Sequence, residues 1–406
     1  MSPVAVNTAP AQSSIEDIEQ LKAKLKSVKL ENGNEINLPP DNTLRRYQKA
    51  GIDLSNGYPY FPPKPEFFQE VSKIREDLRE YKDPALRADK EKKALFGAAK
   101  EVKNLTKWIG TEIIGLQLKD FTDKQKDELA LLVAERHIVF FRDQDLSPQQ
   151  QQELGLYLGD GEIERHPQAA QVPGVGGGLT LIWEQGRKDK LQTGRSHRVP
   201  YGGGQFGWHT DLVHEAYPPG YTHLYQDTVP EVGGDTLWAS GYAAYDKLSP
   251  AFKKVVDGLN GVYRSAHSYK DENNPDADRK PVERTHPLVR THPVTGWKAL
   301  WINQAMTARI EGFDKAESDA ILNYLYGVYE RSTDIQLRWH WTPGTSAIWD
   351  NRTTIHTVSY DYDGERHGTR VSSLAEKPFY DPKSKSRAED LQLAGWINTP
   401  DVAARY

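Results

Sequence analysis

The chain has 406 residues, and its 52 basic and 57 acidic side chains leave a formal net charge of -5 at pH 7. This balance argues against a nucleic-acid-binding scaffold, and the absence of cysteine excludes disulfides and thiolate metal sites. No run approaches the about 18 consecutive apolar residues of a membrane-spanning helix, and the first fourteen residues lack the features of a secretory signal. We therefore expect a soluble, cytoplasmic protein with neither a nucleic-acid nor a membrane partner.

The N-terminal part of the chain carries no catalytic motif. Residues 1–13 are rich in Ala, Pro and Ser and are predicted to form a disordered leader. A helix is predicted to begin after the N-cap residue Ser14, because apolar residues then recur at three- and four-residue steps. Prolines and aromatics over 37–65 indicate an extended segment, and a charged, mostly helical stretch follows to about Lys103. Residues 14–105 are interpreted as an arm that packs on the main domain or on a second subunit of a homo-oligomer.

The main domain is predicted over residues 106–385, where strands and helices alternate. Strands are predicted at 111–118, 137–144, 222–239, 298–303, 336–341 and 347–349, and helices at 123–136, 147–158, 242–260 and 317–330. A polar loop is predicted at 273–284, and residues 386–406 are interpreted as a tail that packs on the domain. This pattern indicates a mainly β protein of the α+β class, with covering helices and a double-stranded β-helix (jelly roll) core.

A glycine-rich connection runs from Gly159 to Gly207 and is interrupted by the apolar run Leu179–Trp183. It lacks the Gly-Lys-Ser/Thr ending of a phosphate-binding loop. Because it leads into a candidate metal pair, we interpret it as a segment that closes over substrate, with an ordinary surface loop as the alternative. Gln205, near its end, is a candidate for the substrate pocket.

The candidate metal pair is His209 and Asp211, where the loop is predicted to turn into a strand. Residues two apart in a strand point to the same face, so the imidazole and the carboxylate can converge on one ion. His356, in a β-branched run far along the chain, is the candidate third ligand. Two histidines and one carboxylate form the facial triad typical of non-haem Fe(II) oxygenases, although zinc accepts the same ligands.

The other histidines are weaker candidates for metal binding. Structural roles are assigned to His137, which lies in an apolar strand, and to His286 and His292, which precede prolines. The rival ligands, which lack a carboxylate partner or face the wrong side of a strand, are His214, His223, His340 and His367.

Two arginines follow His356 in the sequence. Arg366 and Arg370 are four residues apart, so they face the same way in an extended strand. A guanidinium pairs bidentately with a carboxylate, which makes Arg366 a candidate for holding an oxo-acid cosubstrate. Arg370 can then hold a second anion.

Several motifs, taken together and in order, resemble the taurine dioxygenase family of Fe(II)- and 2-oxoglutarate-dependent oxygenases. They are His209-Thr-Asp211, Gly233-Gly-Asp-Thr-Leu-Trp238, His292-Pro-Val-Thr-Gly296, and Trp349-Asp-Asn-Arg352 followed by His356, Arg366 and Arg370. The resemblance covers roughly residues 110–380. It implies that His209, Asp211 and His356 bind Fe(II), and that Thr236 and Arg366 hold the distal carboxylate of 2-oxoglutarate. It further implies that His166 and Arg370 contact the substrate.

The chemistry that the resemblance implies is the oxidative decarboxylation of 2-oxoglutarate with O2. The products would be succinate, CO2 and a hydroxylated substrate. A small anion is the expected substrate, and a sulfonate such as taurine is the leading case, because hydroxylation beside sulfur gives an aldehyde and sulfite. A sulfate ester, an aryloxy acid, or a carboxylate or amino acid of secondary metabolism are alternatives. A metal-free jelly-roll binding protein and a zinc hydrolase, with Glu215 as candidate base, are alternatives from other classes.

Overall fold

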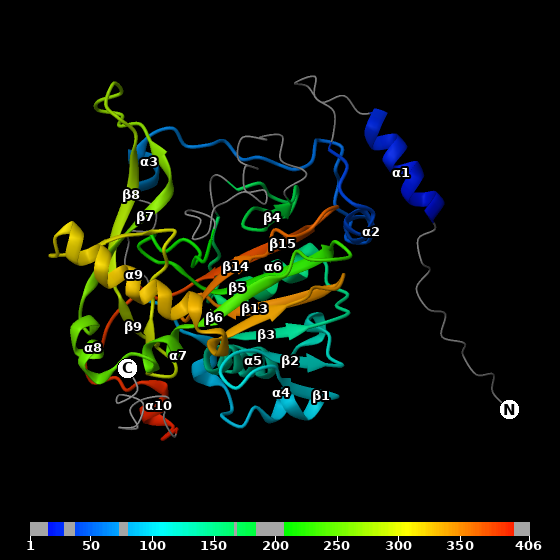
Figure 1. Cartoon of the computed structure of the whole chain (residues 1–406). Helices are drawn as coiled ribbons and strands as arrows, with labels where there is room; N and C mark the ends of the chain where they lie inside the picture. The colour runs from blue at the N-terminus through cyan, green and yellow to red at the C-terminus, as the bar shows by residue number, and fades with distance from the viewer. Residues whose placement is uncertain (1–14, 28–36, 73–79, 166–168, 184–206, 394–406) are drawn as a thin grey trace.

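The computed structural model describes residues 15–27, 37–72, 80–165, 169–183 and 207–393. Two sheets lie at its centre (Figure 1). The larger contains, in spatial order, β1 (Glu101–Asn104), β2 (Thr111–Ile114), β3 (Ile138–Phe141), β13 (Thr345–Asp350), β5 (Pro219–Thr228), β15 (His367–Leu374) and β4 (Thr180–Trp183). The smaller contains β12 (Gln336–Trp339), β6 (Thr236–Ser240) and β14 (Thr354–Val358). Neighbouring strands are antiparallel except β2 and β3.

Large aromatic side chains fill the space between these two sheets. Phe140 of β3 stacks on Trp339 of β12 with ring centroids 3.9 Å apart. Trp238 of β6 packs edge-on against both Phe140 and Trp349 of β13. Because these side chains come from both sheets and are almost completely buried, the two sheets face each other across one apolar core. The predicted jelly roll is confirmed.

Helices cover the outer faces of this sandwich. Residues of α5 (Asp123–Arg136) and α6 (Pro148–Leu158) pack against β3, β5 and β13 of the larger sheet. Each of these helices begins with a capping box, at Thr122 and at Ser147. A second cluster joins α7 (Gly241–Asp246), α8 (Pro250–Val256) and α9 (Lys315–Arg331) to β9 (Val289–Thr291), β10 (Lys298–Leu300) and the smaller sheet.

A third sheet projects from the sandwich. It contains β11 (Thr307–Ile310), β7 (Asn260–Tyr269) and β8 (Lys280–Pro287), and the β7–β8 hairpin stands out at the upper left of Figure 1. Strand β8 begins at Lys280, so the predicted loop over 273–284 is shorter than expected. The last helix, α10 (Arg387–Asp390), contacts α7.

The N-terminal arm packs on its own chain. Helices α1 (Ile15–Ser27) and α2 (Asp41–Lys49) share a buried cluster with Trp183 of β4 and Val371 of β15. The backbones of Tyr60 and Gln171 pair in both directions, and α3 (Phe68–Ser72) contacts β8. The arm therefore reaches both the larger sheet and the projecting hairpin.

Two predictions for the arm were wrong in detail. Residues 37–65 are not extended throughout, because α2 presents Thr43, Leu44 and Tyr47 to the domain at helical spacing after Pro40. The charged stretch to Lys103 is not mainly one helix either. Its described residues form α3, a single turn after Asp83, the short helix α4 (Lys93–Ala98) and strand β1, which pairs with β2.

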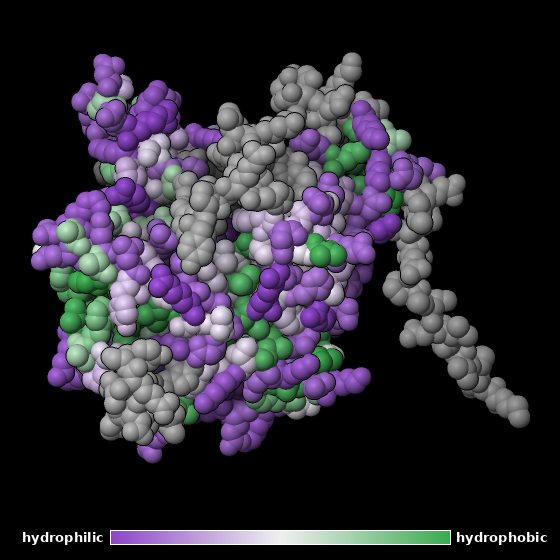
Figure 2. Space-filling view, viewed as in Figure 1, coloured by the Kyte–Doolittle hydropathy of each residue, from purple (hydrophilic) through white to green (hydrophobic). Residues whose placement is uncertain are grey.

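The visible surface is mainly hydrophilic. Figure 2 shows hydrophilic residues over the tip of the β7–β8 hairpin and a small hydrophobic patch over α8 and α9. Between these two helices Phe252 of α8 contacts Tyr324 of α9, which is half exposed, as is Val255 of α8. Within the described ranges, every helix is too short or too polar to cross a membrane.

Candidate active site

His209, Asp211 and His356 form the one cluster of potential metal ligands found among the described residues. One ligand atom from each side chain lies within 4.8 Å of the others. The backbones of His209 and His356 hold each other, with N–H···O distances of 2.9 and 2.8 Å in the two directions. This isolated backbone bridge brings His209 next to His356. Asp211 lies in a turn, so the strand predicted to carry both His209 and Asp211 is not present.

The protonation of these side chains suits a divalent metal. His209 Nδ1 lies 2.9 Å from the carbonyl oxygen of Gly207 and donates to it, which leaves the lone pair on Nε2. Burial and the neighbouring His209 lower the pKa of His356 to about 3, so its ring is neutral. Burial opposes ionisation of Asp211, but Arg370 and the two histidines outweigh it and lower the pKa of its carboxyl group.

The three residues fit the ion that the facial triad implies. Two neutral imidazoles and one ionised carboxylate are the donor set of a non-haem Fe(II) site. His356 Nδ1 is buried and has no hydrogen-bond partner among the described residues, so one lone pair or proton of this ring is unsatisfied. Zinc satisfies the same donors, so the ligand types alone do not choose between the two metals.

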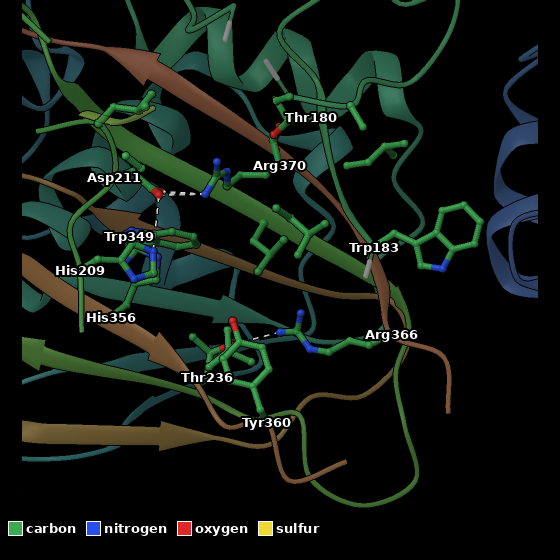
Figure 3. A pocket seen from close by; sticks show the side chains of 18 of the residues that line it. Thr180, Trp183, His209, Asp211, Thr236, Trp349, His356, Tyr360, Arg366 and Arg370 are labelled. Atoms are coloured by element: carbon green, nitrogen blue, oxygen red, sulfur yellow. Dashed lines mark hydrogen bonds and ion pairs between the residues drawn. The ribbon is translucent and has the colours of Figure 1, made fainter. Parts of the chain in front are cut away.

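Thr236 and Arg366 meet on the opposite side of the cavity (Figure 3). Arg366 donates from Nε to the carbonyl oxygen of Gly234 at 3.0 Å and from Nη2 to Thr236 Oγ1 at 3.3 Å. Trp341 Nε1 also donates to Thr236 Oγ1, at 3.0 Å. The hydroxyl oxygen therefore accepts two hydrogen bonds, and its own proton remains available for donation. A carboxylate placed here would receive hydrogen bonds from both side chains.

Arg370 lies beside the candidate metal ligands. Its Nη1 is 2.9 and 3.1 Å from the two carboxylate oxygens of Asp211. Only this nitrogen contacts Asp211, whereas Nε is buried and has no hydrogen-bond partner in the described structure. The side chain can thus hold Asp211 through one nitrogen and still present donors to an anion in the cavity.

These residues line a single cavity of about 290 Å³. Its polar lining includes Thr180, Tyr360, Tyr362 and the predicted site residues His209, Asp211, Thr236, His356, Arg366 and Arg370. Its apolar lining includes Leu181 and Trp183 of β4, so the apolar run in the glycine-rich connection forms part of the wall. The other two predicted site residues, His166 and Gln205, lie outside the described residues. So does most of the segment that we expect to close over substrate.

Several other histidines of the described ranges have partners elsewhere in the protein. His137 contacts Thr353 Oγ1 and Ser240 Oγ at 2.9 and 2.7 Å, so its predicted structural role is confirmed. His223 contacts Ser346, His340 contacts Asp235, and His367 contacts Asp227. Neither His214 nor Glu215 lines the cavity, which weakens the hydrolase alternative.

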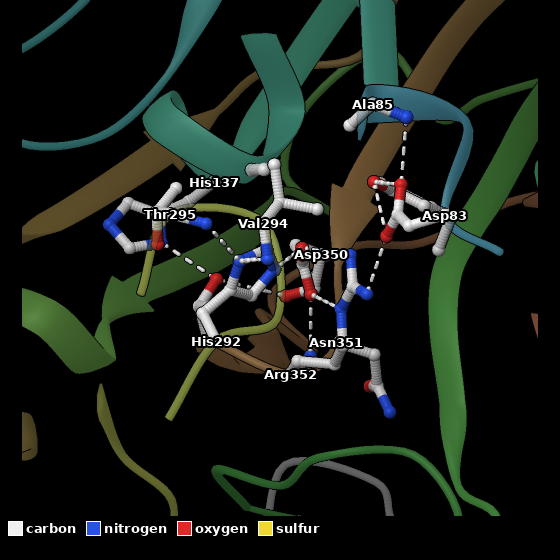
Figure 4. A network of polar contacts seen from close by, with 12 residues as sticks. Asp83, Ala85, His137, His292, Val294, Thr295, Asp350, Asn351 and Arg352 are labelled. Carbon is white, nitrogen blue, oxygen red and sulfur yellow. Dashed lines mark hydrogen bonds and ion pairs between the residues drawn. The ribbon is translucent and has the colours of Figure 1, made fainter. Parts of the chain in front are cut away.

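A residue that the sequence did not single out holds Asp211 in place. Asn351 accepts from the backbone N of Asp211 at 3.0 Å and donates to its carbonyl oxygen at 2.9 Å. Asn351 lies in the motif Trp349-Asp-Asn-Arg352, between Asp350 and Arg352. These two neighbours form a buried ion pair that fixes the backbone on either side of Asn351 (Figure 4). The sequence signal was present in this motif, but only the structure shows which backbone Asn351 contacts.

The network in Figure 4 is centred on Asp350 and Arg352, both of which are fully buried. Arg352 donates to Asp350 from Nε and Nη2, at 2.9 and 2.8 Å, and from Nη1 to Asp83 at 2.7 Å. His292 Nε2 lies 2.9 Å from Asp350, while its Nδ1 accepts from two backbone N–H groups. His292 is therefore a neutral donor to Asp350, and its predicted structural role is confirmed.

Comparison with known proteins gives consistent matches. The family model described as taurine catabolism dioxygenase TauD, TfdA family, matches residues 101–372. A putative alpha-ketoglutarate-dependent sulfonate dioxygenase of Schizosaccharomyces pombe is 35% identical over 82% of this chain and 84% of its own length. An alpha-ketoglutarate-dependent sulfonate dioxygenase of Saccharomyces cerevisiae is 37% identical over 76% of each chain. The crystal structure of a putative alpha-ketoglutarate-dependent taurine dioxygenase from Burkholderia xenovorans is 30% identical, with a TM-score of 0.58 over 70% of this chain and 92% of that one.

Proposed function

The chain belongs to the TauD, TfdA family of taurine catabolism dioxygenases, and on that premise we propose that it is an Fe(II)- and 2-oxoglutarate-dependent dioxygenase acting on an alkyl sulfonate. Its relatives are named alpha-ketoglutarate-dependent dioxygenases, so the chain is an oxidoreductase of that type. The observation that carries the site assignment is the convergence of His209, Asp211 and His356 in a cavity that also contains Arg366 and Arg370.

His209, Asp211 and His356 would hold the metal on one side and leave the cavity side open. When bound, Fe(II) and 2-oxoglutarate together activate O2 for attack on a substrate C–H bond, with succinate and CO2 as products. Arg366 and Thr236 would bind the distal carboxylate of the cosubstrate through charge-assisted hydrogen bonds. Arg366 and Thr236 would thus hold one end of the cosubstrate on the wall of the cavity opposite the metal ligands.

Arg370 would orient the substrate anion next to the metal. Its guanidinium already contacts Asp211 through one nitrogen, so an anion bound to its other donors lies beside the metal ligands. The apolar side chains of Leu181, Trp183 and Leu212 line the same cavity and can hold an alkyl chain. Hydroxylation of the carbon bonded to sulfur would then give an aldehyde and sulfite, with taurine as the reference substrate.

The experiment that tests this function has two stages. Anaerobic addition of Fe(II) and 2-oxoglutarate should produce a weak visible charge-transfer band, which a metal-free binding protein would lack. A panel of sulfonates, sulfate esters and carboxylates should then be assayed for succinate together with sulfite, sulfate or hydroxylated product. Sulfite released in proportion to succinate supports the sulfonate assignment. Succinate coupled to another substrate class, with no sulfite, would move the function to the alternative oxygenases.

A further inference from the structure

A buried polar chain links the N-terminal arm to the arginine proposed to hold the cosubstrate. Tyr58 of the arm contacts His367 Nε2 through its hydroxyl group at 2.5 Å, and His367 Nδ1 lies 2.8 Å from Asp227. The relative exposures of these residues are 3%, 0% and 4%. His367 directly follows Arg366, is the first residue of β15, and is not among the residues that line the cavity. The arm therefore contacts the start of β15, directly after the arginine.

Gln226 of β5 completes this chain. With its amide oriented to satisfy both ends, Nε2 donates to the carbonyl oxygen of His367 at 2.9 Å, and Oε1 accepts from Arg366 Nη2 and Nη1 at 3.1 and 3.3 Å. The side chain reaches across because Gly368 stands opposite; a Cβ there would lie 2.8 Å from the Gln226 amide atom that is Nε2 in this orientation, and 2.5 Å from the carbonyl oxygen of Tyr225. One buried amide thus joins the His367 backbone to the guanidinium of Arg366.

The arm also contacts Asp227, the carboxylate of β5 that lies beside His367. Thr43 donates to Asp227 Oδ1 at 2.7 Å, and Arg46 Nη1 lies 3.4 Å from Asp227 Oδ2 and 2.8 Å from Thr369 of β15. A buried carboxylate without these partners would be strongly unfavourable. The arm is therefore part of the structural support of β15 and not an independent unit lying on it.

Tyr58 has a second contact, with a residue that lines the cavity. Its ring packs against Trp183 of β4, with centroids 5.6 Å apart, and Trp183 lines the cavity. The Trp183 indole N–H donates to Glu365 at 2.9 Å, one residue before Arg366. The same tyrosine thus reaches both chain neighbours of Arg366. It contacts His367 directly, and it contacts Glu365 through Trp183.

We propose that Tyr58 and Gln226 are positioning residues for Arg366, so that the arm prepares the binding site for the distal carboxylate of the cosubstrate. This inference rests on the proposed function of Arg366. The guanidinium is held by Gly234, Thr236 and Gln226, so its orientation is set before the carboxylate arrives. When one of these hydrogen bonds is lost, the guanidinium of Arg366 must be ordered during binding, and this cost lowers the affinity for 2-oxoglutarate.

The test is calorimetric binding of 2-oxoglutarate to the full-length chain loaded with Mn(II), which avoids turnover. Tyr58→Phe should weaken 2-oxoglutarate binding about threefold, and Gln226→Met about tenfold, because the amide contacts the guanidinium directly. The double variant should show less than the product of the two effects, since both act along one path. Affinity for pyruvate, which lacks the distal carboxylate, should be unchanged in every variant.

Tyr242→Phe is the matched control, because that hydroxyl is equally buried and contacts Ala134 and Thr295, away from the cavity. It should lower the thermal midpoint without changing 2-oxoglutarate affinity. If Tyr58→Phe and Gln226→Met behave like this control, the inference is wrong while the proposed function stands. If Tyr58→Phe does not fold, Gln226→Met alone decides the outcome. If the wild-type chain binds no 2-oxoglutarate, both the proposed function and the inference fail.

Discussion

At the level of single residues, neighbouring groups determine which side chains can bind a metal. Gly207 fixes the proton of His209 on Nδ1, and burial keeps His356 neutral, so both rings offer a lone pair. His223 has a pKa lowered to about 3 by burial in the same way, but it contacts Ser346 and lies outside the cavity. A neutral imidazole is therefore not sufficient to make a histidine a candidate metal ligand. The backbone bridge between His209 and His356 also brings these two rings together.

The ligand assignment predicts opposite results for two histidines. His356→Ala removes one of three ligands and should weaken Mn(II) or Fe(II) binding by about 100-fold or more, with loss of the anaerobic charge-transfer band. His214→Ala, at a buried rival histidine outside the cavity, should retain the bound metal. Metal content after desalting measures both. Loss of metal in His214→Ala with retention in His356→Ala would assign the site to the wrong histidine.

The two arginines should affect different ligands. Arg366→Ala removes charge-assisted hydrogen bonds to the cosubstrate and should raise the KM for 2-oxoglutarate by about 50-fold, with little change in the KM for substrate. Arg370→Ala should instead raise the KM for substrate. An equal loss of 2-oxoglutarate affinity in both variants would mean that Arg370 also contacts the cosubstrate.

At the level of secondary structure, the sequence predicted best those elements whose start is marked by a local capping signal. The helix predicted over 123–136 is α5, and its capping residue Thr122 precedes it directly. Helix α2 was missed because its buried face is formed against β5 and β15, far along the chain, amid prolines that locally favour extended backbone. The strand predicted at Asp211 was wrong for a related reason, since a bridge to the distant His356 sets that backbone.

The site was also predictable only in part, because some of its residues act through contacts with distant parts of the chain. His209, Asp211, Thr236, His356, Arg366 and Arg370 carry side chains whose chemistry is visible in the sequence, and their motifs occur in a fixed order. Gln226, Asn351 and Trp341 act through contacts with other protein groups. Their amide and indole groups have no distinctive reactivity. Only Asn351 lies in one of the motifs, and that motif does not show which backbone its side chain contacts.

Asn351 gives the prediction that belongs to this level. Asn351→Ala leaves the buried N–H and carbonyl groups of Asp211 unpaired, which should cost about 2 kcal/mol of stability and weaken metal binding about tenfold. Gln144→Ala is the matched control, because this buried amide also contacts backbone groups, those of Leu118 and Leu116, outside the cavity. It should lower stability with unchanged metal affinity. Equal metal binding by both variants would reduce Asn351 to a purely structural role.

At the level of the whole molecule, two buried ionic contacts join the N-terminal arm to the jelly roll. Arg46 pairs with Asp227 of β5, and Asp83 pairs with Arg352 in the turn after β13. Tyr221 of β5 also donates to Asp83, at 2.8 Å. Because removal of one partner leaves a buried charge uncompensated, the arm and the sandwich should unfold together. We expect a single cooperative transition in which probes of the arm and of the sheets coincide.

The charge network around Asp350 should dominate the response of this transition to acid. Burial opposes ionisation of Asp350, but Arg352 and His292 outweigh it and hold the pKa of this carboxyl group well below its usual value of 3.8. The ionised group therefore contributes its full stability above about pH 4, and this contribution is lost as the pH falls below that value. Asp350→Asn should lower the free energy of unfolding by about 3 kcal/mol at pH 7, with a smaller difference from wild type at pH 2.5.

Denaturant titrations at pH 7 and at pH 2.5 measure both differences. Asp271→Asn is the control, because the pKa of Asp271 is also lowered, to about 2, by hydrogen bonds from Lys280 and Gln69, but the group is exposed to solvent. Solvent screening makes such surface pairs weak, so this variant should follow wild type at both pH values. If Asp350→Asn and wild type instead differ by the same amount at both pH values, Asp350 is not held ionised in the folded protein, and the acid response must come from other carboxylates such as Asp227.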